Sequence, residues 1–236
     1  MAFYTEGPTT QGRGPVHLVF DVNETLLDTA ALDPLFMRWF GTEARRGEWF
    51  LILQETWMTA NLVGHFAPFA ELAKSALRQL GAKHGVSIAP ADEQALVDGV
   101  LGMPAHADAV EALAGLRQQG HTLTALTNSA SAAAQHQLAQ AGLAAYFDAI
   151  LSVDQVERYK PAPEPYRAAA AHWSVAPEAM VMVAAHGWDL IGAQAVGMRT
   201  AFVARPGKAM DPALEQVPTW RSDDLSQLMA QVVAAG

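Results

Sequence analysis

Hydrophobic and polar positions follow two different patterns along the chain, and the change falls near residue 105. Residues 16–20 form a short apolar run that ends at Asp21, which is typical of a strand buried on both faces of a parallel sheet. From about residue 31 to 81, apolar residues recur at spacings of three and four, and residues 92–100 continue this pattern. Such spacings predict helices. No strand pattern interrupts this stretch.

After residue 105 the pattern alternates between strands and helices. We expect strands at 121–126, 149–153, 180–185 and 200–204, and helices at 107–118, 130–141, 164–172, 190–196 and 222–233. Ser222 is expected to cap the last helix, with Asp223 and Asp224 in its first turn. This alternation predicts the α/β class, with a doubly wound parallel sheet. We expect residues 12–29 and 106–236 to form a Rossmann-like core, and residues 30–105 to form an inserted α-helical unit.

Polar residues gather where the predicted strands end. They are Asp21, Asn23 and Thr25 after the first strand, Thr127, Asn128 and Ser129 after the second, and His186 and Asp189 after a later one, with Lys160 in a loop. In a doubly wound sheet, active sites form at the carboxyl ends of the strands. The sequence therefore predicts that these separate segments meet at one edge of the sheet.

The amino-acid composition excludes some classes of binding partner and some kinds of catalysis. Half of the chain (51%) is hydrophobic, and the formal net charge is −9 with no run of basic residues. Nucleic acid is therefore not an expected partner, since phosphate backbones are bound by clustered Lys and Arg. The absence of cysteine excludes disulfides, thiolate catalysis and Cys-ligated metals. No apolar run is long enough to cross a membrane, and no signal peptide is visible, so we expect a cytoplasmic protein.

Four ordered motifs carry a family resemblance. They are residues 20–26 (Phe-Asp-Val-Asn-Glu-Thr-Leu), 126–129 (Leu-Thr-Asn-Ser), 159–161 (Tyr-Lys-Pro) followed by Tyr166, and 183–189 running into Gly192 and Gly197. In order and spacing they resemble the motifs of the haloacid dehalogenase superfamily over almost the whole chain. The resemblance implies a helical cap domain at residues 30–105.

The resemblance also implies roles for these residues. Asp21 is the expected nucleophile, able to attack carbon or phosphorus. Thr25 and Asn128 would hold it or the substrate, although ordinary turn chemistry also explains such residues. Lys160 would keep Asp21 ionised and offset substrate charge, and Tyr166 would orient Lys160. Alone, a lysine is usually a solvated surface residue.

Two positions separate this chain from phosphatases of the superfamily. Those enzymes have a general acid where this chain has Asn23, and a Mg²⁺-binding acid where it has Ala185. An amide cannot donate the proton that a leaving alkoxide needs, whereas a halide needs none. The resemblance therefore narrows to the type II (S)-2-haloacid dehalogenases, which convert small (S)-2-haloacids to (R)-2-hydroxyacids through an aspartyl ester. No metal or other cofactor is expected.

Two departures from that family are visible. Phe50 falls where the family has a halide-binding arginine, and Arg38 or Arg45 would have to replace it. His186 lies three residues before Asp189, and we expect the two to activate water together as a base and its orienting carboxylate. A structural histidine bonded to the backbone is the equally weighted alternative. Glu24, next to the catalytic turn, is assigned no role.

The expected site thus has two groups. The catalytic group is Asp21, Thr25, Asn128, Lys160, His186 and Asp189. The substrate-binding group is Val22, Asn23, Phe50, Thr127, Ser129, Tyr166, Trp188 and Arg38. The expected partner is a small molecule, and a homodimer is left open. Two other functions remain at this point: a phosphatase of the same superfamily, and a catalytically silent binding protein with a retained fold.

Overall fold

The computed structural model describes residues 14–214 and 217–235, and its centre is a parallel sheet. The strands are β1 (His17–Phe20), β2 (Thr122–Thr127), β3 (Ala149–Ser152), β4 (Met180–Ala184), β5 (Arg199–Val203) and β6 (Trp220–Ser222). Their order is β3-β2-β1-β4-β5-β6, and every neighbouring pair is parallel. The predicted α/β class and doubly wound sheet are confirmed.

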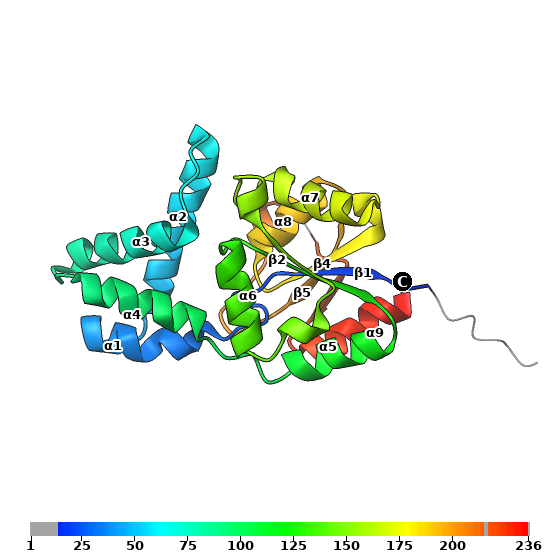
Figure 1. The fold of residues 1–236 in the computed structure, drawn as a ribbon, viewed down its shortest axis with the longest axis horizontal. Coiled ribbons are helices and arrows are strands. Elements are labelled where there is room, and N and C mark those ends of the chain that lie inside the picture. The colour runs from blue at the N-terminus through cyan, green and yellow to red at the C-terminus, as the bar shows by residue number, and fades with distance from the viewer. Residues whose placement is uncertain (1–13, 215–216, 236) are drawn as a thin grey trace, which may run out of the picture.

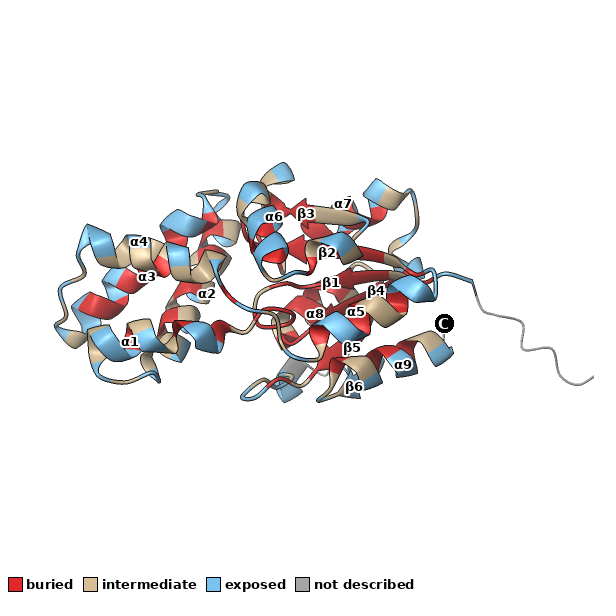
Figure 2. Cartoon of the chain, turned by 60° about the horizontal axis from the view of Figure 1, so that its bottom comes forward, coloured by how far each residue is buried: buried red, intermediate tan, exposed pale blue. Residues whose placement is uncertain are grey.

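Helices cover both faces of this sheet (Figure 1). Along the core they are α5 (Ala109–Gln118), α6 (Ser131–Gln140), α7 (Pro163–Trp173), α8 (Gly187–Ala195) and α9 (Leu225–Ala235). The pair α5 and α9 covers one face, and α7 and α8 cover the other. Figure 2 shows the central strands β1, β2, β4 and β5 as largely buried, whereas the helices are exposed on their outer sides.

The helical stretch near the N-terminus forms a separate group at one end of the molecule (Figure 1). It contains η1 (Thr29–Leu32), α1 (Asp33–Phe40), α2 (Arg45–Val63), α3 (Phe69–His84) and α4 (Pro90–Leu101). Glycines at positive φ end three of these helices: Gly41, Gly64 and Gly85. As expected, none of its described residues adds a strand to the sheet. None of the described helices is long and apolar enough to cross a membrane.

The C-terminal helix begins later than predicted. Ser222 is not its cap, because it ends the edge strand β6, where its carbonyl accepts a hydrogen bond from the Ala204 amide at 2.8 Å. Asp224 takes the capping place, and its carboxylate accepts from the Gln227 amide at 2.8 Å. The β6 strand was not predicted, because its three residues, with an exposed arginine in the middle, show no buried strand pattern.

The two connections between the helical group and the core lie side by side. The Asp28 amide donates to the Pro104 carbonyl at 2.8 Å, and Leu27 forms an antiparallel bridge with Ala105. Nearby, the strand order reverses between β1 and β4. In doubly wound sheets a crevice opens at such a switch point. Asp21 follows β1 directly, and His186 follows β4.

Candidate active site

A small cavity of about 20 Å³ lies at this switch point, beneath α2 and α3. Its walls come from both parts of the molecule: Asp21, Asn23, Phe50, Trp57, Phe69, Thr127, Asn128, His186 and Trp188. Seven of the fourteen expected site residues are in this lining, so segments far apart in the sequence meet around one space. Val22 is not among them, since its side chain is buried in the core and its carbonyl accepts hydrogen bonds from the Leu26 and Leu27 amides.

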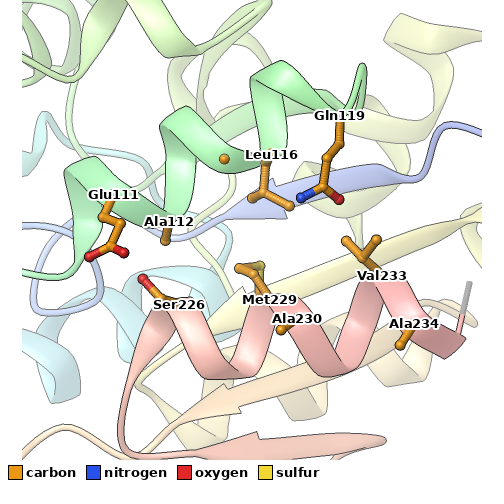
Figure 3. Close-up of a pocket in the computed structure, with 10 residues that line it drawn as sticks. Glu111, Ala112, Leu116, Gln119, Ser226, Met229, Ala230, Val233 and Ala234 are labelled. Carbon is orange, nitrogen blue, oxygen red and sulfur yellow. The ribbon is translucent and has the colours of Figure 1, made fainter.

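A larger cavity of about 460 Å³ lies far from these residues, between α5 and α9 (Figure 3). Figure 3 shows a lining of mostly small and apolar side chains, with Glu111 at one end and Ser226 facing it from α9. Among the residues that the structure describes, no histidine, lysine or arginine lines this groove, and Glu111 is its one charged side chain, so it has no cation to pair with an anionic substrate or a nucleophilic carboxylate. Chemistry therefore favours the smaller cavity.

Asp21 is the buried carboxylate at the floor of that cavity. Its Oδ1 accepts from Lys160 Nζ at 2.9 Å, and its Oδ2 accepts from Thr25 Oγ1 at 2.6 Å and lies 3.2 Å from His186 Nδ1. Burial opposes ionisation, but the charge of Lys160 and the bonds from His186 and Thr25 outweigh it. The pKa of Asp21 therefore lies well below its ordinary value, and the carboxylate is ionised at neutral pH.

Lys160 has no exposed surface and all three of its ammonium protons are used. Nζ donates to Asp21 at 2.9 Å, to Asp189 Oδ2 at 2.6 Å and to the Leu126 carbonyl at 2.9 Å. Burial alone would lower the pKa of Lys160, but the two carboxylates raise it. A permanent cation therefore lies between two carboxylates.

Asp189 is held by Lys160 and Tyr166. The Tyr166 hydroxyl donates to Asp189 Oδ1 at 2.6 Å, so the prediction that Tyr166 orients Lys160 holds only indirectly, through this carboxylate. Burial, together with the nearby charge of Asp21, raises the pKa of Asp189 in spite of Lys160. Lys160 thus contacts both carboxylates, and each has further partners: Thr25 and His186 for Asp21, and Tyr166 for Asp189.

Asn128 fixes the backbone around Lys160. Its Oδ1 accepts from the Lys160 amide at 2.9 Å, while Thr25 is fixed by the Ala185 amide, which donates to Thr25 Oγ1 at 2.9 Å. Thr25 thus contacts Asp21, as expected, whereas Asn128 binds the backbone amide of Lys160.

Asn23 and its neighbours form a second polar chain beside the cavity. Asn23 Nδ2 donates to Ser129 Oγ at 3.3 Å, and the Ser129 amide donates to Thr127 Oγ1 at 3.1 Å. Gln137 on α6 donates to Asn23 Oδ1 at 3.3 Å and to the Val100 carbonyl of α4 at 2.8 Å. This chain positions the Asn23 amide and ties α4 to the core.

The predicted pairing of His186 with Asp189 is wrong. The carboxylate of Asp189 is turned toward Lys160, and the partner of His186 is Glu24, whose Oε2 lies 2.7 Å from Nε2. His186 therefore bridges Asp21 and Glu24 through its two ring nitrogens. Burial disfavours its charged form, but these two carboxylates outweigh burial and raise the pKa of His186.

Glu24, to which the sequence assigned no role, is the second carboxylate in contact with His186. Lys208 Nζ donates to Oε2 at 2.5 Å, Thr29 Oγ1 donates to Oε1 at 3.0 Å, and Arg46 lies 3.7 Å from Oε1. Burial raises the pKa of Glu24, but His186 and Lys208 together lower it to about 2. Its backbone has φ 65°, a conformation that costs energy in a non-glycine residue and that clusters at functional sites.

Aromatic side chains enclose the imidazole of His186. The ring of Phe50 stacks on one side at 5.4 Å and 14°, and Trp188 stacks at 5.0 Å and 27°. Lys208 Nζ lies 5.1 Å from the centre of the Phe50 ring. Phe50 and Trp188 therefore lie in the cavity wall, where the sequence predicted substrate contacts.

Neither arginine proposed as a substitute for the family's halide-binding arginine lines the cavity. Arg38 is exposed over 57% of its side chain and pairs with Asp92 at 3.5 Å, and Arg45 pairs with Glu48 at 2.7 Å. The α1 helix directs Arg38 toward Asp92 of α4, so Arg38 does not line the cavity in which its substrate contact was predicted.

Residues that could hold a metal ion are not clustered. Within residues 14–214 and 217–235, no group of three or more His, Asp and Glu side chains has a suitable arrangement. At the place where a divalent cation could join Asp21 and Asp189, the Lys160 ammonium already contacts both. The residues present therefore suit a lysine cation at this point and do not fit a metal there.

The fold and the site together define a Rossmann-like α/β protein whose buried carboxylates and lysine lie beneath a helical unit. Residues 16–197 match the family model described as haloacid dehalogenase-like hydrolase. The chain belongs to this family.

Two sequence relatives are named (S)-2-haloacid dehalogenases. (S)-2-haloacid dehalogenase 1 of Pseudomonas sp. (strain CBS-3) is 30% identical over 159 residues, which cover 67% of this chain and 70% of the relative. The (S)-2-haloacid dehalogenase of Pseudomonas sp. (strain YL) is 27% identical over 173 residues, or 73% of this chain and 74% of the relative.

Solved structures agree with these relatives. One L-2-haloacid dehalogenase matches with a TM-score of 0.88 and 28% identity, over 94% of this chain and all (100%) of the other. A dehalogenase crystallised as an intermediate complex matches with a TM-score of 0.85 and 25% identity, over 92% and 96% of the two chains. The predicted family and fold are thereby confirmed.

Proposed function

We propose that this protein hydrolyses the carbon–halogen bond of small (S)-2-haloacids and releases (R)-2-hydroxyacids. Asp21 attacks C2 and displaces the halide, and water then hydrolyses the resulting aspartyl ester. The observation that carries the proposal is the state of Asp21, which is buried, ionised and held by Lys160 at the floor of an aromatic cavity. The relatives named (S)-2-haloacid dehalogenases support the substrate class.

Charge balance explains how the site would accept an anionic substrate. Asp21 and a haloacid carboxylate are both negative, and their repulsion opposes binding. Lys160 and an imidazolium at His186 would offset that repulsion, because opposite charges stabilise each other strongly in a buried site. The second carboxylate near Lys160, Asp189, orients the ammonium. No metal ion is needed in this scheme.

The aromatic wall suits the leaving group. Phe50 and Trp188 line the cavity, and their ring edges carry partial positive charge, which favours contact with a halide. This is weaker than the contact a guanidinium would give. We therefore expect bromide and chloride to leave more readily than fluoride.

Substrate entry requires the helical unit to move. A cavity of about 20 Å³ holds about one water molecule, which is less than any haloacid needs. We propose that residues 30–105 act as a cap that opens for substrate and closes over Asp21 to exclude solvent. A cytoplasmic location and a homodimer stay predictions from the sequence.

The proposal predicts halide release from 2-haloacids without a metal. The full chain is incubated with the separate enantiomers of 2-chloropropionate and 2-bromopropionate in the presence of EDTA, and free halide is measured. We expect release from the (S) enantiomers only, undiminished by EDTA, and no detectable release by Asp21→Asn. Arg38→Gln is the control and should keep wild-type activity, because its side chain lies outside the cavity.

Two other results would overturn the proposal. Mg²⁺-dependent cleavage of small phosphate esters, with no halide released, would identify a phosphatase. Failure to turn over either class of substrate, with tight binding of either one, would identify a binding protein.

A further inference from the structure

The hydrogen bonds of His186 define its charge. Nδ1 lies 3.2 Å from Asp21 Oδ2 and Nε2 lies 2.7 Å from Glu24 Oε2. An ionised carboxylate only accepts hydrogen bonds, and a neutral imidazole has a single N–H. Both contacts can be hydrogen bonds only if both nitrogens carry protons. The resting bridge therefore requires an imidazolium.

The surroundings of His186 favour the same state. The charged groups around it are Asp21 and Glu24 in direct contact, Lys160 behind Asp21, and Lys208 and Arg46 behind Glu24. Two aromatic faces, Phe50 and Trp188, enclose the ring, and aromatic faces attract cations. The pKa of His186 is raised accordingly.

Alkylation of Asp21 would remove one half of this bridge. An ester carries no charge and is a weaker acceptor than a carboxylate, so Nδ1–H loses its anionic partner. Glu24 keeps the Nε2 proton, because Lys208 and Thr29 hold its carboxylate in place. The imidazole that remains has its free electron pair at Nδ1, which faces Asp21.

We propose that Glu24 is a positioning residue that holds the Nε2 proton of His186, so that Nδ1 releases its proton when Asp21 is alkylated and recovers one when the ester is hydrolysed. This inference rests on the proposed dehalogenase function. Glu24 then has the task in the second half-reaction that was predicted for Asp189.

The atoms and charges balance in both steps. In the first, an oxygen of Asp21 bonds to C2, the halide leaves with the electron pair of the broken bond, and the Nδ1 proton passes to water. In the second, water adds to Cγ of Asp21 and gives one proton to Nδ1. The ester bond then breaks, and the hydroxyacid oxygen takes the second proton of that water. Asp21 is again a carboxylate and His186 an imidazolium.

The consequence is a defined order of release. Overall hydrolysis produces one proton for each halide. If His186 starts as an imidazolium, that proton appears with the halide, and hydrolysis of the ester releases none. If His186 starts neutral, alkylation releases no proton and the proton appears with the hydroxyacid.

Single-turnover kinetics can separate these cases. Excess enzyme is mixed with (S)-2-bromopropionate in weakly buffered solution near neutral pH, and an indicator dye, a halide probe and quenched samples report proton, bromide and lactate. For the wild type we expect about one proton per bromide, released at the rate of bromide and ahead of lactate. Proton release at the rate of lactate would overturn the proposal.

Matched variants test the part played by Glu24. Glu24→Gln keeps a hydrogen-bond acceptor but removes the charge that supports the imidazolium, so we expect proton release to move to the lactate phase and the ester to persist longer. Glu24→Asp, which keeps the charge, should restore part of the early proton. Glu157→Gln is the control, since Glu157 is an exposed glutamate that also has positive φ, and it should behave as the wild type.

The outcomes also separate this inference from the proposed function. Bromide release with the proton late would remove the role of His186 and leave the dehalogenase intact, whereas no bromide at all would remove the function itself. Wild-type proton timing in Glu24→Gln would show that Glu24 is structural. The measurement on the wild type stands even if a variant fails to fold.

Discussion

At the scale of single residues, the site depends on one buried cation shared by two carboxylates. Lys160 contacts Asp21 and Asp189 and has no exposed side-chain surface. A buried ion pair adds little net stability while it is intact, because desolvation offsets the attraction. Removing one partner leaves uncompensated charge and costs about 3–5 kcal/mol. The same contact that keeps Asp21 ionised should therefore make Lys160 essential for stability.

Replacing Lys160 should expose this dependence. We expect Lys160→Met to lower the free energy of unfolding by about 3–5 kcal/mol at neutral pH, as measured by urea denaturation. Adding Asp189→Asn to that variant should recover part of the loss, because one of the two unpaired charges is removed. Lys74→Met, which breaks a pair with the largely exposed Glu71, should cost less than about 1 kcal/mol. Equal losses for the two lysines would contradict this assignment.

At the scale of elements, the catalytic loop is held by close packing against α8. Gly192 lies in this helix, and a Cβ added there would approach Pro161 Cβ, the Pro161 carbonyl and the Tyr166 hydroxyl to 2.7 Å each. Two of these three contacts are to the proline that follows Lys160. The absence of a side chain at residue 192 therefore sets the position of Lys160 relative to Asp189.

Gly192→Ala should disturb both stability and catalysis. Overpacking of this kind costs about 1–3 kcal/mol, and displacement of the lysine loop should lower kcat for dehalogenation by at least about tenfold, since small misplacements of catalytic groups are costly. Gly115→Ala, within α5, has open space at its Cβ and should stabilise the protein by about 0.5–1 kcal/mol with unchanged kcat. Thermal unfolding and steady-state rates measure both effects. Unchanged activity in Gly192→Ala would show that the loop is positioned by other contacts.

At the scale of the whole molecule, the sheet and the meeting of distant segments were predictable because both follow local patterns. Apolar runs mark the central strands, and polar residues at their carboxyl ends must meet at the switch point. The edge strand β6 was not predictable, since three partly exposed residues carry no such pattern.

The partner of His186 was also beyond the sequence. Glu24 and His186 are 162 positions apart, and their contact depends on a left-handed backbone at Glu24 that no local pattern indicates. Asp189 was the nearer acid in sequence, but Lys160 and Tyr166 hold its carboxylate. A buried histidine required a polar partner, and only the folded chain defines which one it has.

Isotope labelling shows whether Asp21 forms a covalent ester. Excess enzyme is allowed one turnover of (S)-2-chloropropionate in ¹⁸O-water, and the peptides are then analysed by mass spectrometry. Because water adds to Cγ of Asp21, we expect the peptide containing Asp21 to gain one ¹⁸O and the lactate from that turnover to carry none. Label in the lactate, with an unlabelled Asp21 peptide, would mean that water attacks C2 in a single step and would contradict the account.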